Sequence, residues 1–189
     1  MDRAADEEDR LLIQAISQGD RQAIADLYKR HSKRVFLFIK RFLKEDSLSE
    51  DITNDVFIEV WRKAENYEGR SKVSSWILGM ARFKALSEIR KHRPNSTSDD
   101  VLNAITDEAD TPEVTSQKRD KGEALKECIN NLSTEHRLVI DLIYYHDKSI
   151  REVAEILKIP ENTVKTRCFH ARKQLSISMS HRGLDRGWP

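Results

Sequence analysis

Residues 149–175, SIREVAEILKIPENTVKTRCFHARKQL, contain the pattern that decides the fold of this chain. Ser149 and Glu152 are spaced as a capping box, in which each side chain satisfies a backbone N–H group at the start of a helix. The apolar stripe of that helix is Ile150, Val153, Ala154 and Leu157. Pro160 ends it, because proline disfavours helical backbone in the preceding residue. A second helix follows, so the stretch is expected to form a helix-turn-helix.

The second helix of this pair carries the informative surface. Asn162 can adopt a left-handed backbone conformation in the turn, and either Asn162 or Thr163 can cap the helix. The expected buried stripe is Val164, Cys168, Ala171 and Leu175. The opposite face carries hydrogen-bonding, apolar and cationic side chains: Lys165, Thr166, Phe169, His170, Arg172 and Lys173. Such a face suits the major groove of DNA. The alternative, an ordinary helical hairpin with a basic solvent side, leaves an exposed phenylalanine unexplained.

The rest of the chain shows the same helical periodicity. Gly19 ends a short first helix, and Asp20 caps the next one. Apolar residues recur at three- and four-residue steps within 11–16, 24–42, 51–61 and 73–89. No alternating strand pattern bounded by hairpin turns is present, so the fold is predicted to be all-α. The predicted domains are residues 1–93 and 121–189, joined by an acidic linker at 94–120.

The charges are segregated along the chain. The 33 Lys and Arg and the 32 Asp and Glu leave a net charge of +1, which by itself argues against a nucleic-acid-binding protein. Residues 45–59 and 95–113 each hold six acids and no base. Residues 62–93 hold nine bases against three acids, and residues 148–182 hold eight against three. A single block is explained by a solvated helix face, but two separated basic blocks favour two DNA-facing surfaces.

Several classes of protein are disfavoured. The two cysteines, Cys128 and Cys168, do not make a disulfide scaffold or a zinc module and are expected in the core. His170 and Cys168 lie two apart on a helix and face different directions, so they do not form a catalytic pair. We expect no metal and no cofactor. The apolar run 35–39 is far shorter than the roughly 20 residues that span a bilayer, and the N-terminus lacks a signal-peptide pattern. A cytoplasmic location without membrane insertion is expected.

In order and spacing, the chain resembles the bacterial sigma factors, and among them the small extracytoplasmic-function (ECF) class. The resemblance to region 2 of the family is carried by Gly19, Asp20, Ala23, Leu27, Tyr28, the stretch 50–57 with Trp61, and the stretches 67–71, 75–77 and 81–82. The resemblance to region 4 is carried by Leu132, Ser133, Arg137, Val139 and the stretches 149–157, 163–167 and 171–172. Departures from the family pattern are found at Phe83, Ser87, Asn162 and His170.

The resemblance implies three sets of contact residues. Those expected to dock on RNA polymerase are Asp51, Asp55, Phe57 and Trp61, although Phe57 and Trp61 also fit a core role. Those expected to bind the −10 element are Tyr67, Gly69, Arg70, Ser71, Lys72, Arg82, Lys84, Arg90 and Lys91. Those expected to bind the −35 element are Lys165, Thr166, Arg167, Phe169, His170, Arg172 and Lys173. Trp76 is expected to be a core anchor.

The resemblance also implies function and partners. The protein is expected to give core RNA polymerase its promoter specificity, without catalytic chemistry of its own. Its expected partners are the clamp of the largest polymerase subunit, the flap of the second-largest subunit, promoter DNA and an anti-sigma factor. By the same resemblance the acidic linker is expected to thread polymerase channels that RNA later occupies; the alternative is a solubilising tether. Two alternatives are a sigma-like protein that titrates an anti-sigma factor and a free-standing helix-turn-helix regulator.

Overall fold

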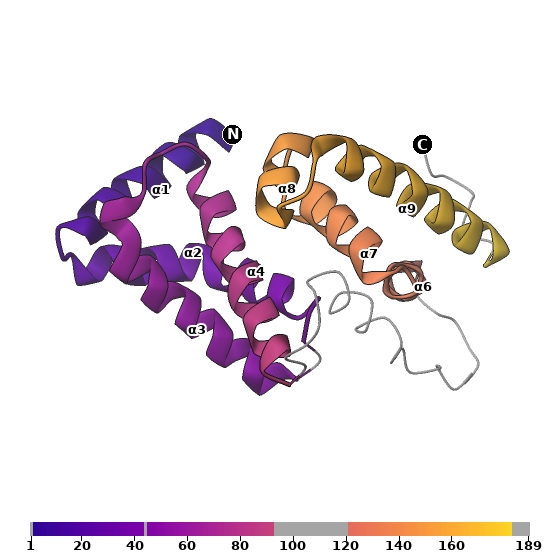
Figure 1. The fold of residues 1–189 in the computed structure, drawn as a ribbon, viewed down its shortest axis with the longest axis horizontal. Helices are drawn as coiled ribbons and strands as arrows, with labels where there is room; N and C mark the ends of the chain where they lie inside the picture. The colour runs from indigo at the N-terminus through magenta and orange to yellow at the C-terminus, as the bar shows by residue number, and fades with distance from the viewer. Residues whose placement is uncertain (1, 44, 93–120, 183–189) are drawn as a thin grey trace. The chain divides into compact units, whose positions relative to one another are not determined.

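The computed structural model describes residues 2–43, 45–92 and 121–182. These residues form helices joined by short turns, with no strand among them (Figure 1), which confirms the predicted all-α class. The chain divides into two compact units, one comprising Met1–Asn95 with Ala154–Lys158 and the other Ser96–Val153 with Ile159–Pro189. The expected linker, 94–120, falls outside the described residues.

The N-terminal helices are α1 (Asp2–Ser17), α2 (Arg21–Ile39), α3 (Asp46–Lys63) and α4 (Val73–His92), with a 3₁₀ turn at Ala64–Asn66. Helix α2 packs against α1, α3 and α4. The largest fully buried side chains of this part are Leu27, Val35, Phe38, Ile39, Val56, Val60, Val73 and Ile77. Burying an aliphatic or phenylalanine side chain contributes about 1.5–3 kcal/mol, so this shared core holds the helices together.

The boundary between α1 and α2 forms as its sequence predicts. Gly19 has φ +88°, in the left-handed region that favours glycine, and its N–H donates to the carbonyl of Ile16. The Asp20 carboxylate accepts from the N–H groups of Gln22 and Ala23, at 2.7 and 3.2 Å. Helix α1 itself is longer than the apolar pattern of 11–16 predicts. Leu11, part of that pattern, is 60% exposed.

The C-terminal helices are α6 (Lys121–Asn130), α7 (Thr134–Ile140), α8 (Ile150–Leu157) and α9 (Glu161–His181), with a π-helical segment at Asp141–Tyr145. Helix α9 packs against α6 and α7. Leu175 packs against the buried side chains of Leu132, Ile140 and Ala171. Cys128 and Cys168 are both buried, as expected of core residues.

The helix-turn-helix forms, but its turn differs from the prediction. The Ser149 N–H donates to Glu152 Oε2 at 2.9 Å and the Glu152 N–H donates to Ser149 Oγ at 3.3 Å, which confirms the capping box. The left-handed residue is Lys158, with φ +55°, and not Asn162. Helix α9 starts at Glu161 after Pro160, so Asn162 is already helical and neither it nor Thr163 is the cap. Pro160 is the N-cap residue, with extended backbone at φ −62° and ψ 147°, and it supplies no side-chain hydrogen bond to the helix.

Among the described residues, no helix is both long enough and apolar enough to cross a membrane.

Loss of the capping box should destabilise α8. Ser149→Ala removes the hydroxyl that binds Glu152 and should lower the free energy of unfolding of the C-terminal helices by about 1 kcal/mol. Urea unfolding followed by circular dichroism, with hydrogen exchange at the α8 amides, measures the change. Gln174→Ala, on the exposed side of α9, is the control and should have little effect. Equal stability of the two variants would contradict the prediction.

Candidate nucleic-acid interface

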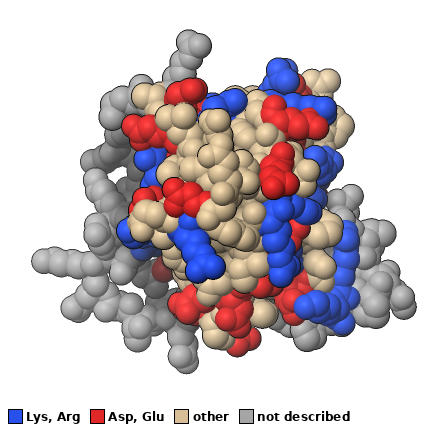
Figure 2. All heavy atoms as spheres, turned by 90° about the vertical axis from the view of Figure 1, so that its left-hand side faces the viewer, with Lys and Arg blue, Asp and Glu red and all other residues tan. Residues whose placement is uncertain are grey.

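The charge blocks of the sequence do not stay separate in space. Helix α3, which carries the acidic block, packs against α4, which carries basic residues. Asp55 Oδ2 on α3 lies 3.9 Å from Lys84 Nζ on α4. The face drawn in Figure 2 accordingly has Lys and Arg interspersed with Asp and Glu. Lys84, which is expected to bind DNA, thus forms a long ion pair with Asp55 of the neighbouring helix.

The exposed face of α3 holds three of its four predicted docking residues. Asp51 and Asp55 are exposed, and Trp61 is 36% exposed. Phe57 is only 4% exposed and packs edge-to-face on Tyr28, with ring centroids 4.8 Å apart. Phe57 is therefore a core residue, which corrects its assignment as a docking side chain.

A further apolar residue on this face was not among the predicted docking set. Ile58 is 48% exposed and lies about one helical turn after Asp55 and about one helical turn before Trp61. The signal that finds it is helical spacing, because residues three and four apart share a face. Docking is a prediction for this face, and we call its exposed residues Asp51, Asp55, Ile58 and Trp61 the α3 docking face.

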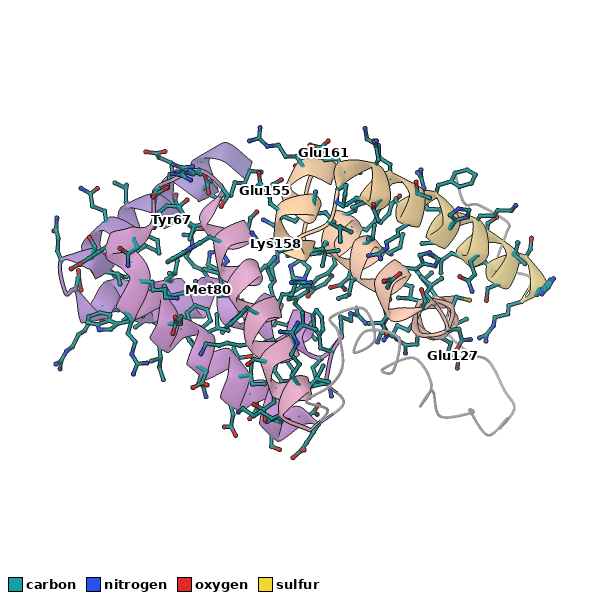
Figure 3. All side chains as sticks on the ribbon, viewed as in Figure 1. Tyr67, Met80, Glu127, Glu155, Lys158 and Glu161 are labelled. Carbon is teal, nitrogen blue, oxygen red and sulfur yellow. The ribbon has the colours of Figure 1, made fainter. Side chains whose placement is uncertain are left out.

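The loop between α3 and α4 forms a pocket that is open to solvent. The pocket has a volume of about 160 Å³ and is lined by Asn66, Tyr67, Glu68, Gly69, Arg70, Ser71 and Trp76. The Tyr67 and Trp76 rings lie against each other with centroids 5.0 Å apart, and Tyr67 is labelled in Figure 3. Trp76, expected to be a core anchor, is half-buried and also supplies part of the pocket wall. We call this the loop pocket.

Two features fix the chemical character of the loop pocket. The Tyr67 hydroxyl donates to the backbone carbonyl of Ser71 at 2.5 Å, which closes the loop. Burial raises the pKa of Tyr67, so its phenol stays neutral and remains a donor at neutral pH. Arg70 Nε lies 2.5 Å from Glu68, but their side chains are 85% and 61% exposed. Such a surface ion pair is worth about 0–1 kcal/mol, so Arg70 is easily released to an incoming phosphate.

The predicted −10 residues on α4 differ in accessibility. Arg90 and Lys91 are exposed, and Lys91 Nζ lies 2.6 Å from Glu88. Arg82 is half-buried and Lys72, before the helix, is also half-buried. Phe83, where the chain departs from the family pattern, is 68% exposed. The loop pocket and the outer face of α4 therefore each present cationic and aromatic side chains close together.

Helix α9 presents the predicted face to solvent. Six of the predicted −35 residues are exposed: Lys165, Thr166, Phe169, His170, Arg172 and Lys173. Phe169 is 59% exposed and contacts the ring of His170 edge-on, at 5.4 Å between centroids. The helix begins at Glu161, which is labelled with Lys158 of the preceding turn in Figure 3. A face that mixes donors, an apolar ring and cations has the composition that major-groove contacts need.

Arg167 is placed differently from the other predicted −35 residues. Its guanidinium lies 2.5 Å from Glu135 of α7, and the two side chains are only 18% and 23% exposed. The ion pair joins α9 to α7. The structure therefore gives Arg167 a packing role that its position in the sequence pattern does not reveal.

Among the described residues, no group of three or more His, Cys, Asp or Glu side chains is placed to hold a metal ion.

Two family models match the chain. The model of Sigma-70 region 2 matches residues 27–94, and the model of Sigma-70 region 4 matches residues 122–175. The chain is 28% identical over 167 residues to the ECF RNA polymerase sigma factor SigK of Mycobacterium ulcerans, covering 87% of this chain and 89% of SigK. It is 27% identical over 172 residues to the ECF RNA polymerase sigma factor SigW of Bacillus subtilis, covering 86% and 92%.

Solved structures share the fold. CnrH, in complex with the cytosolic domain of CnrY, has a TM-score of 0.64 at 19% identity, covering 92% of this chain and 98% of CnrH. The sigma factor RpoE of Bartonella quintana, in complex with the anti-sigma factor NepR, has a TM-score of 0.61 at 21% identity, covering 82% and 96%.

Removing the ion pair between α7 and α9 should cost stability. Arg167→Ala should lower the free energy of unfolding by about 1.5–3 kcal/mol, because it breaks a charged hydrogen bond and leaves the half-buried Glu135 carboxylate without its arginine partner. Glu135→Gln should cost less, and the double variant should fall short of the sum of the two. Urea unfolding measures all three. Lys165→Ala, exposed on the same helix, is the control; an equal loss in that variant would contradict the assigned role.

Proposed function

The chain belongs to the sigma-70 family, as an ECF RNA polymerase sigma factor, and on that premise we propose that it directs promoter-specific initiation through a −10 and a −35 element. The observation that carries the proposal is the loop pocket, an open aromatic and cationic pocket inside the region 2 match. In this role the protein is a transcription regulator that contributes no catalytic chemistry. It acts in the cytoplasm, together with the polymerase.

At the −10 element, the loop pocket accepts one unpaired base of the non-template strand. The base stacks on the wall formed by Tyr67 and Trp76, whose rings lie 5.0 Å apart. Stacking of a base on an aromatic ring is worth about 1–3 kcal/mol, which offsets the few kcal/mol needed to unstack it from the duplex. Arg70 and Lys72 hold the neighbouring phosphates, and the exposed Arg90 and Lys91 continue the path of the backbone along α4.

At the −35 element, α9 enters the major groove. Thr166, Phe169 and His170 face the base edges, and the exposed Phe169 ring is suited to thymine methyl groups. Lys165, Arg172 and Lys173 bind phosphates, which fixes the register of the helix on the duplex without reading sequence. Arg167 does not contact DNA in this proposal; its ion pair with Glu135 holds α9 against α7.

The α3 docking face binds the clamp of the largest polymerase subunit. Its exposed acids Asp51 and Asp55 complement a basic partner, and Ile58 and Trp61 supply apolar area at the centre of such a contact. The C-terminal helices bind the flap of the second-largest subunit. We further propose an anti-sigma factor as a regulatory partner, which covers these surfaces; support comes from RpoE, whose solved structure is a complex with the anti-sigma factor NepR.

The two alternatives explain less of the molecule. A free-standing helix-turn-helix regulator has no use for the α3 docking face or the loop pocket. A protein that only titrates an anti-sigma factor has no use for the exposed Lys165 and Lys173 on α9.

Transcription reconstituted with core RNA polymerase tests the function directly. Addition of this protein to core polymerase should produce initiation from discrete start sites on a genomic template library, because promoter choice resides in the added chain. Core polymerase alone is the control. Tight binding to duplex promoter DNA without polymerase, at about 10⁻⁸ M or below, would favour a free-standing regulator instead. Absence of specific initiation on every template would exclude the proposal.

Substitutions on α9 should separate into two kinds. Arg172→Ala and Lys173→Ala should weaken binding to all promoter sequences and reduce the slope of log affinity against log salt by about 1, because each removes a phosphate contact. Thr166→Ala, Phe169→Ala and His170→Ala should instead change the preferred −35 sequence. A promoter library transcribed by each holoenzyme at two salt concentrations measures both effects. Identical behaviour of all five variants would mean that α9 is oriented differently on DNA.

A further inference from the structure

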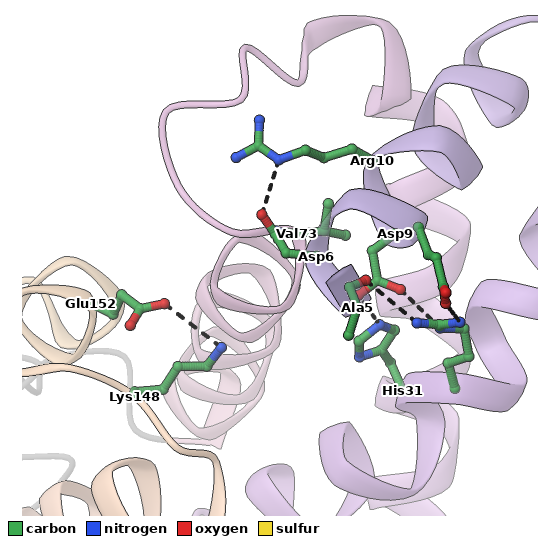
Figure 4. A network of polar contacts seen from close by, with 10 residues as sticks. Ala5, Asp6, Asp9, Arg10, His31, Val73, Lys148 and Glu152 are labelled. Atoms are coloured by element: carbon green, nitrogen blue, oxygen red, sulfur yellow. Dashed lines mark hydrogen bonds and ion pairs between the residues drawn. The ribbon is translucent and has the colours of Figure 1, made fainter. Parts of the chain in front are cut away.

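Two side chains of helix α1, Asp6 and Arg10, contact the backbone around the loop pocket without lining the pocket itself. Arg10 Nη2 donates to the carbonyl of Gly69 at 3.3 Å, and Arg10 Nε donates to Asp6 Oδ2 at 3.0 Å. The other oxygen of that carboxylate, Asp6 Oδ1, accepts from the N–H of Val73 at 3.1 Å. Asp6 and Arg10 thus bridge the pocket-lining Gly69 to Val73, the first residue of α4. Figure 4 shows the contact between Arg10 and Asp6, with Val73 beside it.

Asp6 acts as the cap of α4, although it lies 67 positions from Val73 in the sequence. The first N–H groups of a helix have no partner within the helix, and a buried one must find a partner elsewhere. Val73 is fully buried, and the side chain of Lys72, which precedes it, carries donors but no acceptor. A carboxylate at this end of a helix is also favoured by the helix dipole. The start of α4, which carries the Trp76 wall of the loop pocket, therefore depends on a residue of α1.

The contact with Gly69 is close and specific. Gly69 has φ +69°, in the left-handed region where other residues are strained. A Cβ atom built at this position would lie 2.9 Å from Arg10 Nη1. The guanidinium is therefore packed directly on the backbone of the loop, where it holds one conformation of Gly69. The Arg10 guanidinium is charged at neutral pH, as arginine always is in proteins, and the hydrogen bond to Asp6 is the main cause that raises its pKa further.

Helix α1 is itself fixed on α2, one turn beyond Asp6. Asp9 is 4% exposed, and its carboxylate lies 2.9 Å from Arg30 Nε and 2.8 Å from His31 Nε2. Arg30 also pairs with Glu8 at 2.8 Å. A carboxylate so deeply buried requires partners of this kind, so the position of α1 along α2 is well determined. The contacts therefore run from α2 through α1 to the loop and to α4. Figure 4 shows the part between α2 and α1, where His31 meets Asp9.

We propose that Asp6 and Arg10 are positioning residues for base capture, because they hold the loop pocket in its open, base-accepting form before DNA arrives. This inference rests on the proposed function of the loop pocket. An unrestrained loop must be ordered when the base binds, at a cost of about 1–2 kcal/mol for each residue fixed. A loop already held by α1 does not incur that cost, so affinity for the unpaired base is higher.

The test uses the holoenzyme, with Asp6→Ala and Arg10→Ala. Each variant should lose about 5- to 30-fold in affinity for a fluorescent single-stranded −10 oligonucleotide, the equivalent of about 1–2 kcal/mol. Binding to core polymerase and to a −35 duplex should change less than twofold, a split that a general folding defect would not produce. Asp6→Asn keeps an oxygen acceptor for the Val73 N–H and should recover part of the loss. Glu7→Gln on α1 and Arg21→Ala on α2, both at exposed positions, are the matched controls and should behave as the wild type.

Two further measurements keep the proposal falsifiable. The double variant of Asp6 and Arg10 should lose little more than either single variant, because both act through one bridge. In the free protein, hydrogen exchange at the Val73 amide should accelerate in Asp6→Ala and not in Glu7→Gln. Wild-type oligonucleotide affinity in both alanine variants would overturn the positioning role and leave the proposed function intact. An unchanged Val73 exchange rate in Asp6→Ala would overturn the positioning role, whatever the transcription experiment shows. Failure of the wild-type holoenzyme to initiate would count against the proposed function instead.

Discussion

The packing of α2 against three other helices is the constraint on which the N-terminal part of the molecule depends. Leu27, Phe38 and Ile39 are completely buried there, and the apolar area that they remove from water holds α1, α3 and α4 together. A polar contact adds direction to this core. The buried Asp9 must have partners, and it finds them in Arg30 and His31 of α2. The apolar core therefore brings the helices together, while Asp9 fixes where α1 lies along α2.

The proposed interaction surfaces are the helix faces that packing leaves exposed. Helix α3 turns Ile52, Val56 and Phe57 inward, so the α3 docking face consists of the residues on its opposite side. Helix α9 buries Val164, Cys168 and Ala171, and for the same reason its exposed cations and the Phe169 ring face outward: Lys165, Arg172 and Lys173. In both helices, the residues on the buried face stabilise the fold, and the residues on the opposite face are therefore the ones accessible to a polymerase or to DNA.

Folding also changes how the charges of the chain act. In the sequence, acids and bases form separate blocks, but α3 and α4 pack together and bring Asp55 to 3.9 Å from Lys84. Opposite charges at this distance weaken each other's field beyond the immediate surface. The end of α4 and the outer side of α9 keep cations exposed to solvent, as in Arg90, Lys91 and Lys173. The order of charges along the chain indicates DNA binding, and the three-dimensional arrangement selects which cations face outward.

The sequence by itself determined the helical class, the Asp20 cap, the Ser149–Glu152 capping box and the two faces of α9, because these depend on residues within one or two helical turns of each other. Only the tertiary structure decided that Phe57 packs on Tyr28, that Arg167 pairs with Glu135, and that Trp76 lines the loop pocket. It also decided that α4 is capped by Asp6. Each of these contacts joins residues that lie far apart in the chain or depends on which helix covers which face. Periodicity identifies the apolar side of a helix, but the partner of each side chain on that side is set only when the helices pack.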